Sequence, residues 1–492
     1  MMRAKFYPLA VTAIAALSIF GGRPAAATVY SVPAASLPAT IALAVDGDTI
    51  NVFAGTCSVP VTINKSLEIR GAQADVPGSA SGRGASETIL ANGLTVAATG
   101  VQLNGLVITG GDGVGDVTGT GANVRAASNA LLFINNIVED NTFGVYLNGA
   151  GHVVLYNLFR NNNRPGSARG DGIYSDGGLS DSIIANNVFE DNEIGSIVIL
   201  GNKKGTSAQN ITISDNEIMD DGTMALYGIN TVTVTRNHVC NVANGHALLL
   251  GGGNNHVSVS DNQFLASEYR GIRISAGGGY PANRDIRIYN NDIIDNQQGG
   301  LSVVTGAYAD GGTLVYDRVA DGDVDAECNS WGAISGPTNA GNPGGTGDKV
   351  SGTADFIPFR KYASLTNNVS ATLLQTYSNV STRTYLQVVR ITNHGCKAVI
   401  GPGYFVIDGL TPNGVQFVNP TGTQDDACQP PVGSPWFTFV NSPNTLQAGQ
   451  SVIVTLKFTT NVGVTFSPTK IGGTDGTLLN PVGRRILAVS YR

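Results

Sequence analysis

Tyrosine and aspartate residues in short alternating segments are the part of the sequence best suited to bind a ligand. Tyr146, Tyr174 and Tyr227 each lie in such a segment, and Asp171 and Asp176 flank Tyr174. Tyrosines about 5 Å apart on a sheet face can stack on sugar rings while nearby acids bond to hydroxyl groups. Tyrosine is also a common strand residue and aspartate beside glycine a common turn residue, so the structural interpretation stays open.

Basic residues could serve a different chemistry. A lyase or epimerase must neutralise a uronate carboxylate and take a proton from the sugar ring. Arg270 and Arg273, together with His246, could do this, and an arginine-rich segment around residues 160–169 is an alternative. Solvated surface arginines that bind nothing specific remain the other interpretation.

A repeat must position these side chains. An asparagine recurs at intervals of 21 to 30 residues, and an apolar residue follows each one two positions later. The aligned asparagines are Asn136, Asn157, Asn187, Asn216, Asn237, Asn262 and Asn291. Apolar residues alternate before most of them, which predicts a strand, and a second polar column comes five positions after. Short strands and turns at this period predict a parallel β-solenoid with stacked asparagines and an outward-facing strip that contains the tyrosines.

The two ends of this region resemble a known family. Residues 36–56, with "GDTINVFAGT", are similar to the amino-terminal cap of secreted right-handed parallel β-helix proteins of the pectin-lyase-like superfamily, in the group with carbohydrate-binding and sugar-hydrolase repeats. Residues 329–358, with "NSWG", "GP" and "NPGG", are similar to its closing segment. The resemblance implies an all-β chain with a right-handed parallel β-helix of about a dozen three-strand coils over residues 28–361.

Three segments within the repeats resemble the active strands of polygalacturonases. Asp220 and Asp221 stand where that family has paired acids, His246 follows a glycine as in its histidine strand, and Arg273 lies in a segment like its basic strand. The resemblance implies that these four residues are catalytic, with the acids dividing acid and base work on a glycosidic bond. The third aspartate and the lysine of the family pattern are absent, and coincidence within a repeat stays open.

A different pattern begins near residue 364. The asparagine columns stop and alternating segments appear between proline and glycine turns, for example Tyr385–Ile391 and Ser451–Phe458. We predict an immunoglobulin-like β-sandwich over residues 362–492. The segment resembles the sandwich modules of secreted bacterial proteins, which implies that it holds or presents the solenoid.

The first 27 residues predict export. Arg3 and Lys5 precede an apolar run, and small residues end the segment, as in a secretory signal peptide. The net charge of −7 becomes −10 without this segment, because it contains three basic residues and no acid. We therefore expect a secreted, periplasmic or surface protein without a transmembrane segment and without a nucleic-acid partner. The oligomeric state stays open.

Five cysteines in an exported chain allow two disulfides. Cys396 and Cys428 lie in one segment and form the predicted pair, while the pairing of Cys57, Cys240 and Cys328 stays open. The cysteine and histidine spacing predicts no metal site, and we expect no cofactor. Together these features predict a secreted bacterial protein that binds polysaccharide along its outer sheet, as a lyase, hydrolase or epimerase of acidic glycans if it is an enzyme. The alternative is a non-catalytic adhesin-like surface protein.

Overall fold

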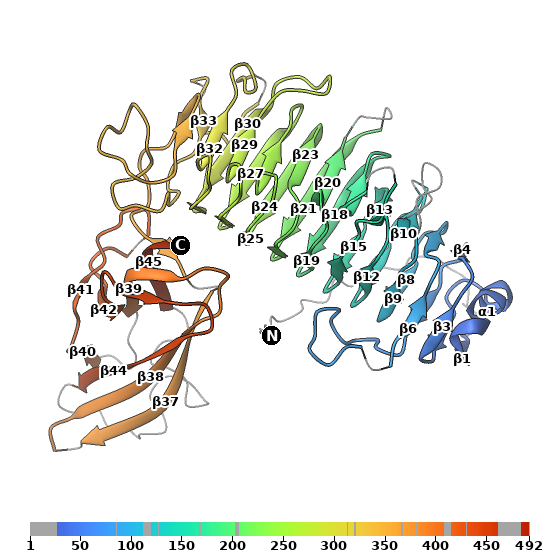
Figure 1. The fold of residues 1–492 in the computed structure, drawn as a ribbon, viewed down its shortest axis with the longest axis horizontal. Coiled ribbons are helices and arrows are strands. Elements are labelled where there is room, and N and C mark those ends of the chain that lie inside the picture. The colour runs from blue at the N-terminus through green and yellow to red at the C-terminus, as the bar shows by residue number, and fades with distance from the viewer. Residues whose placement is uncertain are drawn as a thin grey trace. The chain divides into compact units, whose positions relative to one another are not determined.

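The protein is seen in a computed structural model (Figure 1) that describes residues 27–84, 86–111, 120–125, 127–166, 169–201, 206–311, 313–318, 321–365, 368–379, 381–407, 415–429, 431–460 and 484–491. The predicted signal peptide lies outside these residues except for Ala27. Two compact units are formed, Met1–Ser258 with Ser275–Asp285 and Val259–Ile274 with Ile286–Arg492. The domain boundaries inferred from the sequence, between residues 27 and 28 and between residues 361 and 362, stay predictions.

Three parallel sheets form the β-helix that the sequence predicted (Figure 1). In the described part of the chain they hold 14, 10 and 11 strands, which agrees with about a dozen coils. Sheet A contains β1 Val29–Val32, β2 Thr49–Val52, β5 Glu68–Arg70, β8 Gln102–Asn104, β11 Leu132–Ile134, β15 Val153–Leu155, β18 Leu179–Ala185, β21 Ala208–Ser214, β24 Ile229–Thr235, β27 Asn255–Ser260, β30 Arg284–Tyr289, β33 Val324–Asp325 and β35 Ala354–Asp355, with β14 Gly149–Ala150 beside β18.

Sheets B and C supply the other two strands of each coil. Sheet B contains β3 Gly55–Cys57, β6 Thr88–Leu90, β9 Leu106–Ile108, β12 Ile137–Glu139, β16 Leu158–Arg160, β19 Val188–Glu190, β22 Glu217–Met219, β25 His238–Cys240, β28 Gln263–Leu265 and β31 Asp292–Ile294. Sheet C contains β4 Val61–Ile63, β7 Leu94–Val96, β10 Thr120–Val124, β13 Phe143–Leu147, β17 Asp171–Ser175, β20 Gly195–Leu200, β23 Met224–Tyr227, β26 Leu248–Leu250, β29 Ile272–Ile274, β32 Leu301–Val303 and β34 Val350–Ser351.

The core lies inside the coils. Side chains at equivalent positions stack on one another, as Phe159 and Phe189 do with ring centroids 4.8 Å apart and planes 9° from parallel. At the amino-terminal end, η1 (Ala34–Ser36) and the seven-residue helix α1 (Leu37–Leu43) form the expected cap, with Leu37 and Ile41 buried. Trp331 is fully buried in the closing segment of the second unit. Among the described residues, no helix has the length and apolar character needed to span a membrane.

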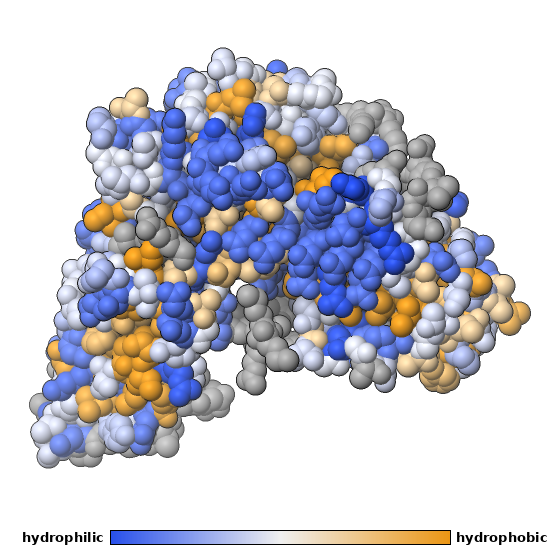
Figure 2. Space-filling model, in the orientation of Figure 1, coloured by the Kyte–Doolittle hydropathy of each residue, from blue (hydrophilic) through white to orange (hydrophobic). Residues whose placement is uncertain are grey.

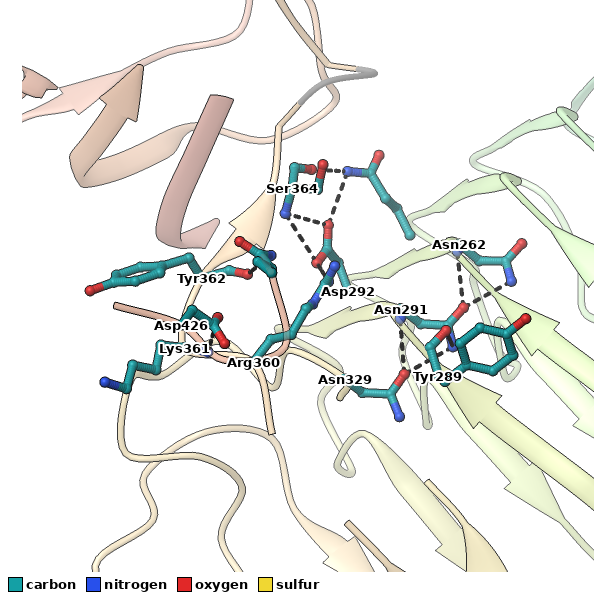
Figure 3. Close-up of polar contacts among 12 residues, drawn as sticks. Asn262, Tyr289, Asn291, Asp292, Asn329, Arg360, Lys361, Tyr362, Ser364 and Asp426 are labelled. Carbon is teal, nitrogen blue, oxygen red and sulfur yellow. Dashed lines mark hydrogen bonds and ion pairs between the residues drawn. The ribbon is translucent and has the colours of Figure 1, made fainter. Parts of the chain in front are cut away.

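The aligned asparagines form the first asparagine ladder, at the turn between sheets A and B. All seven are at most 1% exposed. From Asn157 onward in the first unit, each side-chain oxygen accepts from the backbone and the amide of the preceding coil, as Asn187 Oδ1 does from Asn157 N and Nδ2, both at 2.9 Å. In the second unit, Asn262, Asn291 and Asn329 continue the pattern (Figure 3). This arrangement confirms the stacking that the repeat predicted.

The second polar column forms a similar ladder at the turn between sheets B and C. Asn141, Asn162 and Asn192 each donate to the next member, and Asn192 Nδ2 donates to Asp221 Oδ2 at 2.7 Å. The residue before each member has a positive φ, for example 52° at Asn161 and 52° at Asp220. Asparagine and aspartate tolerate this conformation better than most residues, which explains why polar residues recur at the turns. Figure 2 shows hydrophilic residues gathered over β15, β18 and β19.

The second unit also contains two antiparallel sheets, consistent with the predicted sandwich. One sheet contains β36 Ala363–Ser364, β45 Arg484–Tyr491, β39 Val399–Ile407, β42 Pro435–Val440 and β41 Gly422–Thr423, with β43 Thr445–Leu446 beside β39. The other contains β37 Val369–Asn379, β38 Thr384–Asn393, β44 Ser451–Thr460 and β40 Val415–Phe417. Asp292 joins the last coils to this region, because it pairs with Arg360 and accepts from Ser364 N (Figure 3).

The predicted pairing of Cys396 with Cys428 is wrong. Cys428 is bonded to Cys328, with a Cα–Cα distance of 5.4 Å. The physical reason is that the turn before Cys428 folds against the linker after the last coil, where Asp426 accepts from Lys361 N at 2.7 Å. Cys240 and Cys396 are each disulfide-bonded as well, and Cys57 is buried and free.

Candidate functional site

The outer face of sheet C in the first unit carries the predicted tyrosine strip. The printed register places Tyr146 opposite Tyr174, Tyr174 opposite Val198 and Val198 opposite Ala225. These four residues therefore form one outward column over four successive coils, because side chains alternate between the two faces of a strand. Both tyrosines are half-buried, so part of each ring faces solvent.

Tyr146 and Tyr174, named here the tyrosine pair, share one acceptor. Their rings stack with centroids 6.1 Å apart and planes 20° from parallel. The Tyr146 hydroxyl donates to Asp176 Oδ1 at 2.6 Å and the Tyr174 hydroxyl to Asp176 Oδ2 at 3.3 Å. Burial, followed by the charge of Asp176, raises the pKa of Tyr174. The pair is therefore a fixed surface of two neutral rings over one carboxylate.

The turn after β17 holds Asp176 in place. Asn148, which is 1% exposed, accepts from Gly177 N at 2.7 Å and from the Ser175 hydroxyl at 3.2 Å. These bonds fix the backbone on both sides of Asp176. Phe143 packs against the same group, with its ring centroid 6.2 Å from that of Tyr146 and 6.1 Å from that of Tyr174. The hydrogen bonds of this turn and the packing of Phe143 thus hold the tyrosine pair in a fixed arrangement before a ligand binds.

Tyr227 does not lie in the column of the tyrosine pair. It is opposite Leu200, two residues further along the strand, so the prediction of one continuous strip is wrong at this position. Its ring lies against Gly251, where a Cβ atom would come within 1.9 Å of Tyr227 Cε1. It packs on Tyr280 with centroids 5.5 Å apart, and Asp176 acts on Tyr280 electrostatically. The aromatic surface is therefore wider than a single column of side chains.

Asp171 lies beside the tyrosine pair at the start of β17. It is 5% exposed, and its Oδ1 atom has no hydrogen-bond partner. A Cβ atom on Gly195 of the next coil would come within 2.6 Å of this oxygen, so the carboxyl lies close against the Gly195 backbone. Burial, and to a smaller extent the charge of Asp221, raises the pKa of Asp171 well above its usual range.

Asp220 and Asp221 have different surroundings. Asp220 is exposed at the turn with positive φ, and its Oδ1 accepts from Asn241 Nδ2 at 3.1 Å. Asp221 is 2% exposed and belongs to the second ladder, where it accepts from Asn192 and from Gly222 N. Burial raises the pKa of Asp221 to about 7, against the lowering effect of these hydrogen bonds. Both acids thus take the places that polar residues have in the other coils.

The histidine and the arginines lie in different units. His246 belongs to the first unit, is 8% exposed, and donates its backbone N–H to Thr223 Oγ1 at 3.1 Å. Arg270 and Arg273 belong to the second unit, and Arg270 Nη1 donates to the Gln298 carbonyl at 2.7 Å. Burial and the neighbouring charge of Arg273 lower the pKa of Arg270. Catalytic roles for His246, Arg273 and the two acids stay predictions.

Phe143 and Tyr280 were missed by reasoning from the sequence. Phe143 begins the strand that also contains Tyr146, and simple alternation would place these two side chains, three residues apart, on opposite faces, so their ring contact could not be read from the pattern. Tyr280 comes from a glycine-rich segment outside the repeat alignment. Gly251 lies against the ring of Tyr227, and Gly228 lies against the ring of Tyr280. A search of the sequence for glycines that could pack against aromatic rings would have pointed to this region.

Comparison with known proteins agrees with this architecture. The model of the family described as "Right handed beta helix region" matches residues 120–293. With the three parallel sheets, this match confirms that the chain contains a right-handed parallel β-helix. The curated proteins give no match.

Several solved structures are similar to the chain. An alginate lyase from Paenibacillus sp. is 13% identical, with 61% of this chain and 99% of that chain covered and a TM-score of 0.36. The A-module of the mannuronan C-5 epimerase AlgE6 from Azotobacter vinelandii is 13% identical, with 65% and 91% covered and a TM-score of 0.43. The tailspike protein of the E. coli bacteriophage HK620 is 11% identical, with 86% and 82% covered and a TM-score of 0.31. Because these TM-scores lie below 0.5, we draw nothing about activity from them.

Proposed function

We propose that the chain is a secreted protein that binds polysaccharide along the outer face of sheet C in its first unit. The observation that supports this most strongly is the tyrosine pair, two half-buried stacked rings whose hydroxyls are both held by Asp176. A rigid aromatic surface with polar edges suits a sugar, which has apolar ring faces and a hydroxyl rim. Preorganisation also lowers the entropy lost on binding.

The repeat spacing adds a second argument. Successive coils are about 4.8 Å apart, so the column from Tyr146 to Ala225 is an extended row rather than a closed pocket. Tyr227 and Tyr280 widen this row at the later coils. A linear polymer that contacts several coils gains affinity from each of them, which a small ligand cannot do.

A binding assay tests the proposal. The secreted protein is titrated calorimetrically with a panel of neutral and acidic polysaccharides, and the best ligand is then titrated into a Tyr146→Ala/Tyr174→Ala variant. Loss of the two rings should weaken binding by about tenfold or more, at roughly 1 kcal/mol or more per lost stacking contact.

The control is Tyr377→Ala in the sandwich region. Tyr377 is 50% exposed, and its hydroxyl is hydrogen-bonded to Gln375. This variant should bind like the wild type. If both variants lose the same affinity, or if the wild type binds no glycan on the panel, the proposal is wrong.

Processing of the bound glycan is the second candidate function, with Asp220, Asp221, His246 and Arg273 as proposed catalytic residues. The observation that favours it is Asp221, whose pKa of about 7 lies where a general acid works well. Its place in the ladder favours a structural role instead. Incubation with the panel, read by reducing ends and by the absorbance of unsaturated products, separates a hydrolase or lyase from an adhesin-like protein, which would bind without turnover.

Export is part of the proposal. The segment before Thr28 has the features of a signal peptide, and two disulfides suit an oxidising compartment. Amino-terminal sequencing of the exported protein should give a chain that begins near Thr28. A protein that retains Met1 in the cytoplasm would contradict this part.

A further inference from the structure

Two aromatic rings outside the tyrosine pair pack on one another in the first unit. Tyr227 ends β23, and Tyr280 comes from the glycine-rich segment before β30. Their ring centroids are 5.5 Å apart and their planes differ by 42°. Both side chains are partly exposed, so part of each ring faces solvent. These two residues are named here the second aromatic group.

The backbone beneath Tyr280 holds this ring in position. A Cβ atom on Gly228 would come within 2.7 Å of Tyr280 Cε1, and one on Gly253 within 3.0 Å of Tyr280 Cδ1. The Gly253 N–H donates to the carbonyl oxygen of Pro281, the next residue in the chain, at 2.7 Å. Tyr280 therefore lies directly against backbone that carries no side chain, and its position is set before a ligand binds.

The second aromatic group lies diagonally across sheet C from the tyrosine pair. Tyr174 is opposite Val198 and Val198 opposite Ala225, and Tyr227 is two residues beyond Ala225 on the same strand. At about 4.8 Å per coil and about 3.3 Å per residue, Tyr227 is roughly 10 Å further along the β-helix than Tyr174 and roughly 7 Å to one side. A sugar ring is similar in size to one tyrosine ring, so a single sugar cannot contact both groups.

The surface between the two groups is continuous. Val198 and Leu200 of β20 lie between them, because Val198 is opposite Tyr174 and Leu200 is opposite Tyr227. Both side chains are partly exposed and apolar. Burial is the main cause of the raised pKa values of Tyr174 and Tyr280, and the charge of Asp176 contributes to both, so this carboxylate is near both groups. A chain that stacks on the tyrosine pair can therefore continue over β20.

We propose that Tyr227 and Tyr280 form a second sugar subsite, and that one linear glycan crosses sheet C diagonally from the tyrosine pair to this subsite. The inference rests on the proposed function and specifies its ligand as a linear chain long enough to reach both groups. Once the first contact has formed, the second forms at a high effective concentration, so the two subsites act together. A short oligosaccharide fills one subsite and lacks this gain.

A series of linear oligosaccharides, from disaccharide to hexasaccharide, tests the second subsite by calorimetric titration. The series has the composition and linkage of the polysaccharide that binds best. The quantity compared is the ratio of the hexasaccharide affinity to the disaccharide affinity. In the wild type this ratio should be about tenfold or more. In Tyr227→Ala/Tyr280→Ala it should fall to about threefold or less, because one subsite remains.

Two further variants keep the test independent of folding. Tyr280→Ala alone removes a ring that lies outside the strands of the three sheets, and it should lower the ratio by about threefold. The control Phe53→Ala removes a ring of the first unit that is 56% exposed and follows β2 of sheet A. This control should keep the wild-type ratio. Thermal unfolding of each variant shows whether a lost affinity reflects a lost fold, and where the double variant is destabilised, Tyr280→Ala decides.

The two proposals fail in different ways. If the wild type binds no glycan of any length, the proposed function is wrong. If it binds but its affinity does not rise with chain length, only the second subsite is wrong. The same conclusion holds if the variants of the second aromatic group keep the wild-type ratio.

Discussion

Buried polar groups differ in their hydrogen-bond partners between the first asparagine ladder and sheet C. In the ladder, Asn157, Asn187 and Asn216 each accept two hydrogen bonds and donate two, so their amides are fully paired. Asp171, at the start of a strand of sheet C, is also buried but leaves one oxygen without a hydrogen-bond partner. The polar groups of the ladder are paired with one another and with the backbone, whereas Asp171 Oδ1 has no hydrogen-bond partner.

The same difference separates Asp171 from Asp221, two acids whose pKa values are both raised. Asp221 replaces an asparagine in the second ladder, and its three hydrogen bonds come from Asn192 and Gly222. Asp171 has no comparable donors. A raised pKa therefore does not identify a functional residue by itself, and the hydrogen-bond partners show that Asp221 is a member of the ladder whereas Asp171 is not.

The largest expected effect is the loss of one ladder member. Asn187→Ala removes four hydrogen bonds, including the one that Val154 O accepts and the one that the backbone N–H of Asn157 donates inside the β-helix. We expect the free energy of unfolding to fall by about 3–5 kcal/mol, or the protein to aggregate. Chemical denaturation monitored by circular dichroism measures this.

The matched control is Asn163→Ala, which changes an exposed asparagine next to the second ladder. Its free energy of unfolding should stay within about 0.5 kcal/mol of the wild type. Equal losses in the two variants would mean that the buried ladder does not hold the coils together.

A smaller effect is expected from Asp221→Asn, and its sign depends on pH. The folded-state pKa of about 7 lies above the unfolded value near 4, so the wild type is stabilised below pH 4 and loses this contribution as the pH rises through 7. Asparagine does not titrate and can donate as the other ladder members do. The variant should melt about 2–5 °C higher than the wild type at pH 8 and gain less at pH 4.

Turnover assays on the same Asp221→Asn protein connect stability with function. A more stable variant with unchanged glycan binding assigns Asp221 to the ladder. A well-folded variant that loses turnover by orders of magnitude would instead make Asp221 a catalytic residue and remove the distinction drawn between the two acids.

The smallest effect is expected from Asp176→Asn. The amide retains an acceptor for one tyrosine hydroxyl but loses the charge that both hydroxyls now share. We expect glycan affinity to fall by about three- to tenfold, less than for the loss of both rings. An affinity equal to that of the wild type would show that the position of the tyrosine pair does not depend on Asp176.

The sequence predicted the β-helix because its signal is local and repeated. An asparagine with an apolar residue two positions later marks a turn and an inward strand in each of the seven aligned repeats, and stacking then follows from the repeat. The cysteine pairing was predicted wrongly because Cys328 and Cys428 are 100 residues apart and meet only where the linker folds back. Proximity in the sequence carried no information about that contact.

The candidate site could be predicted only in part. Strand alternation is enough to place Tyr146 and Tyr174 on one outer face, and their spacing sets them on neighbouring coils. The position of Tyr227 outside the column of the tyrosine pair, the packing of Tyr280 and the burial of Asp171 against Gly195 are not contained in the repeat pattern. An exposed aspartate in a turn and a buried aspartate have similar neighbours in the sequence. Only the structure therefore distinguishes them.

Hydrogen–deuterium exchange with and without the oligosaccharide that binds best tests the central claim most directly. If the outer face of sheet C in the first unit is the glycan surface, peptides that contain β13 and β17 should gain protection, while peptides of β37 and β38 should not change. Protection confined to the sandwich strands, with none on β13 or β17, would contradict the account.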